Sequence, residues 1–158
     1  MSMDDLVLAR ALHVLAIVHW IGGVGFVTLV VLPYALSRAS AAEGLAFFDA
    51  VERRFASQVR LSIPIAGAAG LWLTYKMDVW ERFRDLHFWW MGAMLGLWLV
   101  FMILVFVVEP LIKDSFDELA ARDPSAALHR LSRLHRILLA IAALTILGAV
   151  AGAQGLVF

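Results

Sequence analysis

Residues 11–33 read ALHVLAIVHWIGGVGFVTLVVLP, and this stretch decides the fold. Before Pro33 it holds no full charge, and its polar side chains are His13, His19 and Thr28. A helix needs about 20 mainly apolar residues to cross a bilayer, and this run is long enough. Titratable side chains are costly in hydrocarbon and usually face the interior of a bundle. Both histidines are therefore candidates for a functional site.

The composition points to an integral membrane protein. The 158 residues are 63% hydrophobic and 16% charged, with a mean hydropathy of +0.86, which is too apolar for a soluble domain of this length. Thirteen basic and 13 acidic residues balance to a net charge of zero, which argues against nucleic-acid binding. Cysteine is absent, so disulfides, thiolate metal sites, iron–sulfur clusters and covalently attached haem are excluded. We expect one membrane domain over residues 1–158, with its first helix retained rather than cleaved as a signal peptide.

The pattern predicts an all-α bundle of four transmembrane helices, over about residues 6–32, 55–75, 86–108 and 124–157. Short surface helices are expected over about 41–52 and 116–122. Pro33 and Glu109-Pro110 are expected to end the first and third spans. The predicted helix starts are two capping boxes, Ser40 with Glu43 and Ser115 with Glu118, and two aspartate caps, Asp85 and Asp123.

Basic residues predict the orientation of the bundle. The first and third connections carry Arg38, Arg53, Arg54, Arg60, Lys113, Arg122, Arg130, Arg133 and Arg136, whereas the other side carries Arg10, Lys76, Arg82 and Arg84. By the positive-inside rule both termini lie outside, in a bacterial inner membrane. Trp72, Trp80, Trp89 and Trp90 fall toward the outer ends of the second and third spans, as an interfacial aromatic belt would.

Depth separates the five histidines. His13 lies three residues past Arg10, and His87 lies two residues past Asp85 on a span of opposite direction, so the two rings are expected at one level. Facing imidazoles at one level suit the two axial ligands of a haem. His19 lies deeper and could ligate alone, line a proton path or bond a helix carbonyl. His129 and His135 lie among arginines at the cytoplasmic end of the last span, where an interfacial role is the simpler interpretation.

Other side chains extend this hypothesis. Lys76, Arg82 and Arg84 share the predicted outer side with His13 and are candidates for binding haem propionates. Arg60 is a weaker candidate, since it lies on the inner side and arginines there often reach lipid headgroups. As an alternative, Met91 and Met94 lie three residues apart on one helix face and could bind copper together with His19, although methionine is also common filler in apolar helices.

Several short motifs, in order along most of the chain, resemble one membrane superfamily. They are Leu12-His13-Val14, Trp20-x-Gly22-Gly23, Leu32-Pro33, Val51-Glu-Arg-Arg54, Gly70-Leu-Trp-Leu73, Leu86-His87 and Arg130-Leu-x-Arg133-Leu. The chain resembles the superfamily that contains the copper-resistance D (CopD) proteins and the HemJ-type protoporphyrinogen oxidases. The resemblance implies a four-helix membrane protein that binds haem b, with His13 as a candidate ligand.

The resemblance leaves two activities to weigh. HemJ-type enzymes use a lysine shortly after the Leu-His of the third helix, and here Leu86-His87 is followed by Phe-Trp-Trp-Met. We therefore expect a HemJ-like protein that lacks this lysine and exchanges electrons with a quinone or a small redox substrate. Its haem would be held by His13 and His87, with His19 and His135 as weaker ligands. The alternatives are a CopD-type copper-binding or transport protein and a purely structural subunit. The bilayer and further copies of the chain are the other expected partners.

Overall fold

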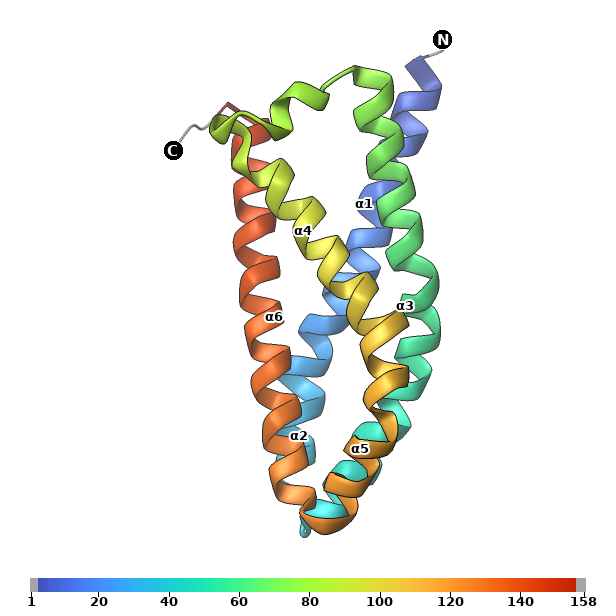
Figure 1. Cartoon of the computed structure of the whole chain (residues 1–158), viewed down its shortest axis with the longest axis vertical. Coiled ribbons are helices and arrows are strands. Elements are labelled where there is room, and N and C mark those ends of the chain that lie inside the picture. Colours follow the sequence, from blue (N-terminus) through green and yellow to red (C-terminus); the bar gives the residue numbers. More distant parts are fainter. Residues whose placement is uncertain (1–2, 156–158) are drawn as a thin grey trace.

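The computed structural model describes residues 3–155, which within these bounds are entirely helices and connecting turns. Figure 1 shows long helices lying side by side, with the two ends of the described part of the chain at the same end of the molecule. In chain order the elements are α1 (Met3–Phe26), η1 (Val27–Val31), α2 (Leu32–Leu36), α3 (Ala41–Met77), η2 (Trp80–Phe83), η3 (Leu86–Phe88), α4 (Trp89–Ile103), η4 (Leu104–Val108), α5 (Glu109–Arg122) and α6 (Pro124–Ala153).

Three continuous helical stretches are long and apolar enough to cross a membrane, namely Asp4–Leu36, Leu86–Arg122 and Pro124–Ala153. Large apolar side chains cover their outer faces, as at Leu15 (66% exposed), Leu29 (69%) and Leu147 (66%). A contiguous apolar exterior of this kind needs lipid or a partner to cover it. The structure therefore indicates a multi-pass membrane protein. The fourth predicted span falls within α3, which is not among these three stretches.

Two prolines expected to end helices do not end them. The helical stretch that begins with α1 continues through Pro33 to Leu36. The stretch that begins with α4 continues through Pro110 to Arg122. Each proline follows a five-residue π-helix, η1 or η4, that stops two residues earlier. Proline removes one backbone donor and clashes with the carbonyl four residues before it. A π-helix shifts carbonyls to donors five residues on, so the helical stretch can pass the proline without a break.

The connections also differ from the prediction. The surface helix expected over 41–52 and the span over 55–75 are one continuous helix, α3, because neither glycine nor proline interrupts the residues between them. Ser115 lies inside α5, so the second predicted capping box is wrong. The caps at Ser40, Asp85 and Asp123 are confirmed, since each side chain accepts a hydrogen bond from a backbone N–H in the following turn. The last span was expected to reach residue 157, but α6 ends at Ala153, and residues 156–158 lie outside the described part of the chain.

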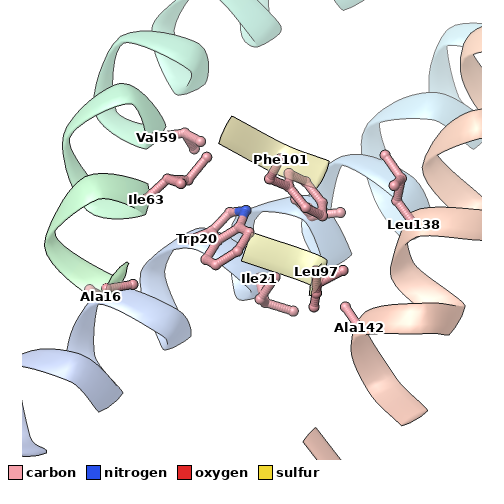
Figure 2. Close-up of a cluster of buried hydrophobic side chains, with 11 residues drawn as sticks. Ala16, Trp20, Ile21, Val59, Ile63, Leu97, Phe101, Leu138 and Ala142 are labelled. Atoms are coloured by element: carbon pink, nitrogen blue, oxygen red, sulfur yellow. The ribbon is translucent and has the colours of Figure 1, made fainter. Parts of the chain in front are cut away.

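Trp20 lies at the centre of a cluster of buried apolar side chains. Figure 2 shows its indole among side chains from α1, α3, α4 and α6. It meets the ring of Phe101 edge to face at 4.8 Å between centroids. Its buried Nε1 has no hydrogen-bond partner among the described residues. Neighbouring aromatic packing offsets this unmet donor only weakly, since an N–H contact with a ring is a second-order interaction.

Tryptophans of α4 fill the spaces over glycines of α6. A Cβ at Gly148 would clash with the ring of Trp89, and one at Gly152 would clash with the ring of Trp90. Gly148 and Gly152 form a small-residue face on α6, and this face is used for close contact with aromatic rings rather than with another backbone. Trp90 is only 7% exposed, so this member of the predicted aromatic belt belongs to the core.

Candidate functional site

His13 is held against α3 in one defined orientation. Its Nδ1 lies 2.7 Å from the carbonyl oxygen of Ala66, and the ring is half-buried. A carbonyl can only accept, so Nδ1 carries a proton and donates, which in the neutral tautomer leaves the lone pair on Nε2. Gly70 makes room for the ring, because a Cβ there would lie 2.9 Å from Cε1 of His13. The sequence places a histidine in this helix, and α3 fixes its tautomer.

His19, about two turns further along α1, has both ring nitrogens engaged. Nδ1 lies 3.2 Å from Oγ of Ser62, and Nε2 lies 3.2 Å from Oε1 of Gln58. The Gln58 amide nitrogen donates to the carbonyl of Arg54 at 3.2 Å, which turns the amide oxygen toward the histidine. The network joins α1 to α3. A metal at either nitrogen of His19 would displace one of these hydrogen bonds.

The structure does not join His13 and His87 through any hydrogen bond or ring contact among the described residues. His87 is exposed in η3, where its backbone N–H donates to Asp85 at 2.9 Å and its ring lies 5.4 Å from that of Phe88. The shared axial role of the two histidines therefore stays a prediction. η3 holds the predicted ligand before α4 begins, not within the first turn of an α-helix.

The ring of His135 makes contacts within α6 and with α3. Its Nδ1 donates to the carbonyl of Leu131, one turn earlier in α6, at 2.9 Å. Its ring meets Phe48 edge to face at 5.9 Å between centroids, so it packs α6 against α3. His129 is exposed on α6.

The predicted propionate partners occupy two different settings. Lys76 lies 4.7 Å from the ring centre of Trp72, Arg82 lies 4.8 Å from that of Phe88, and Arg84 is exposed. Lys76 lies six residues after Gly70, in the last turn of α3. Arg60, by contrast, is paired with Glu109 at 2.6 Å, an ion pair that joins α3 to α5 and that the sequence analysis did not foresee.

The copper alternative has less support in the geometry. Met91 and Met94 are half-buried in α4, while both nitrogens of His19 bond to α3. Within residues 3–155, no three histidine, aspartate or glutamate side chains are grouped as a metal site would require. His13, with one nitrogen bonded and the other available, has the arrangement most suited to ligation.

Charged side chains gather where α3 meets α5. Burial raises the pKa of the Glu52 carboxyl, and the nearby carboxylates of Glu109 and Asp49 raise it further, while Arg60 and Arg53 oppose them. Burial also raises the pKa of Asp49. Both acids lie in the charged first half of α3, and each binds its proton more tightly in the folded chain than in the unfolded chain.

Glu52→Gln is expected to stabilise the fold at neutral pH. Because the pKa of Glu52 is raised in the folded state, the unfolded chain loses this proton first, and stability falls as pH rises from the ordinary value of 4.5 through the folded value. Glutamine removes this loss. Unfolding in detergent should give a higher free energy of unfolding for the variant than for the unaltered chain at pH 7, and equal values at pH 4. Glu81→Gln, at an exposed position in η2, should leave the free energy of unfolding unchanged at both pH values. Equal gains at both pH values would contradict the assignment.

Comparisons with protein-family models, with curated proteins and with solved structures find no match. The residues that carry the resemblance occupy distinct places: Trp20 lies in the core, Gly70 lies under the ring of His13, and His87 lies in η3.

Proposed function

We propose that this chain is a membrane protein that binds haem b, with Nε2 of His13 as an axial ligand. The observation that carries the proposal is the 2.7 Å contact between Nδ1 of His13 and the carbonyl of Ala66. Metal-ligating histidines almost always donate their other ring N–H to a carbonyl, a carboxylate or water. That bond fixes the tautomer and the ring orientation before the metal arrives.

His87 is the proposed second ligand, and Lys76, Arg82 and Arg84 are the proposed partners of the propionates. When bound, haem supplies one-electron chemistry whose potential depends on its axial ligands and on burial. The residues of the chain would supply nitrogen ligands, cationic partners and a low-dielectric surround. We propose a quinone or a small redox molecule as the partner that exchanges electrons with this site.

We also propose that α3 supplies a fourth span and that both termini face outward. α3 lies along α1 in Figure 1, and polar groups in its second half are matched inside the bundle. The Thr74 hydroxyl donates to the carbonyl of Gly70 at 3.0 Å, and Trp98 of α4 donates to that of Ile63 at 2.9 Å. Hydrocarbon tolerates only backbone and side-chain groups matched in this way.

An optical spectrum of the purified full chain, produced in cells supplied with haem, tests the proposal. We expect a Soret band that shifts on reduction with dithionite and one or more haems per chain by pyridine haemochrome. Protein that folds as a helical membrane protein, yet carries no haem after such production and binds none when titrated with haemin, would rule the proposal out. Metal analysis that found copper without porphyrin would favour the alternative.

Gly70→Ala is expected to weaken haem binding without removing a ligand. A Cβ at this position would lie 2.9 Å from Cε1 and 3.2 Å from Nδ1 of His13, so we expect the ring to shift and its bond to Ala66 to weaken. Loss of an outer partner of a ligating histidine costs roughly 10–100-fold in affinity. Haemin titration measures the change. Gly92→Ala is the matched control, since a Cβ there meets nothing within 4 Å. Equal affinity in both variants would contradict the role of Gly70.

A further inference from the structure

A groove of about 670 Å³ lies between α3 and the junction of α1 with η1, away from His13. Its walls are mainly apolar and include Phe26, Val27, Phe47 and Phe55. Its volume falls within the range of about 300–1,000 Å³ typical of sites for small organic ligands. The groove therefore offers a surface large enough for part of an amphiphilic molecule.

Packing elsewhere in the bundle holds the aromatic walls in place. The ring of Phe55 lies so close to Gly23 that a Cβ on that glycine would clash with it. The ring of Phe47 meets Tyr34 edge to face at 5.1 Å between centroids. Because both rings already pack against other residues of the chain, binding at the groove would require little reorganisation.

The charged residues that line the groove are both arginines, Arg53 and Arg54, and no acidic side chain lines it. Nε of Arg53 donates to the carbonyl of Asp49 at 3.2 Å. Within residues 3–155, the terminal nitrogens of Arg53 and the side chain of Arg54 make no hydrogen bond and no ion pair, whereas Arg60 on the same helix is paired with Glu109. Two guanidinium groups that line one groove and have donors to spare match an anionic phosphate.

We propose that this groove binds one anionic phospholipid, with its phosphate at Arg53 and Arg54 and an acyl chain against Phe26, Val27 and Phe55. Charge complementarity selects an anionic headgroup, and the apolar walls select a lipid rather than a free anion. Basic pockets between membrane helices bind anionic lipids by the same chemistry. The groove shares no residue with the surroundings of His13, and its lining residue Gln58 bonds to His19 instead.

Native mass spectrometry of the full chain in detergent, titrated with dioleoyl phosphatidylglycerol or dioleoyl phosphatidylcholine, tests the proposal. We expect saturable binding of one phosphatidylglycerol per chain, and weaker binding of phosphatidylcholine. The double variant Arg53→Gln/Arg54→Gln should lose about tenfold or more in affinity for phosphatidylglycerol, because it removes the charged hydrogen bonds to the phosphate. The control Arg130→Gln/Arg133→Gln removes two exposed arginines of α6 and should bind as the unaltered chain does.

Ala50→Trp separates a lipid from a free anion, because it fills the groove and leaves both arginines in place. We expect this variant to lose phosphatidylglycerol, and inorganic phosphate at millimolar concentration to leave lipid binding unchanged. Equal binding of the two lipids, unchanged binding in the Arg53/Arg54 double variant, or displacement by phosphate alone would overturn the proposal. So would a dimer that Ala50→Trp dissociates, since the groove would then hold a second copy of the chain.

Discussion

His13→Ala is expected to abolish haem binding, whereas His19→Ala should leave it intact. The first substitution removes the ring whose Nδ1 is fixed by Ala66 and whose Nε2 is available to iron. The second removes a ring whose two nitrogens already bond to Ser62 and Gln58. Absorbance at the Soret band per mole of folded protein measures both. We expect less than about a tenth of the unaltered haem content in His13→Ala, since loss of a ligand exceeds the 10–100-fold effect of losing an outer partner.

Two further variants make this result specific. His129→Ala replaces an exposed histidine of α6 and should behave as the unaltered protein does. His87→Ala should retain some haem but convert its spectrum from low spin to high spin, if His87 is the second ligand. Full haem content in a folded His13→Ala protein would show that iron is bound elsewhere. Loss of haem in His19→Ala with His13→Ala unaffected would transfer the ligand role to the deeper histidine.

The course of the helices could be predicted only where the deciding interactions are local. Caps at Ser40, Asp85 and Asp123 involve residues two or three positions apart, so their side-chain chemistry is enough to place them. Pro33 and Pro110 were expected to end helices, because proline removes a donor and clashes with the preceding turn. A five-residue π-helix precedes each proline and lets the helix pass it, and no local sequence signal marks where these π-helices form.

The candidate site shows the same division. A histidine within an apolar span is costly enough in hydrocarbon to be expected inside the bundle, and His13 does contact α3. Its partner is a backbone carbonyl, which every residue possesses, so nothing in the sequence distinguishes Ala66. The Arg60–Glu109 pair joins residues 49 positions apart. Opposite charges near the inner ends of two predicted spans could have suggested it, but only once α3 and α5 were known to be neighbours.

Gly44→Ala is expected to cause the largest loss of stability among single glycine substitutions. A Cβ on Gly44 would clash with the backbone carbonyl of Ala35 and would lie 3.2 Å from Cδ1 of Leu128. Overpacking of this kind costs about 1–3 kcal/mol, and a backbone obstacle cannot rotate away as a side chain can. The helix preference of alanine returns about 0.5–1 kcal/mol. With the cost at the upper end of the overpacking range, because the obstacle is backbone, we expect a net loss of about 2 kcal/mol in the free energy of unfolding, measured by titration with SDS in mixed micelles.

The control for this substitution is Gly96→Ala in α4, where an added Cβ meets nothing within 4 Å. It changes the same atoms in the same kind of helix, so it isolates helix preference from the clash. We expect it to be neutral or slightly stabilising. If Gly44→Ala were as stable as Gly96→Ala, α2 and α3 could not approach each other as closely as the structure has them. Because α3 carries Ala66 and Gly70, the position of the surface that orients His13 would then also have to be revised.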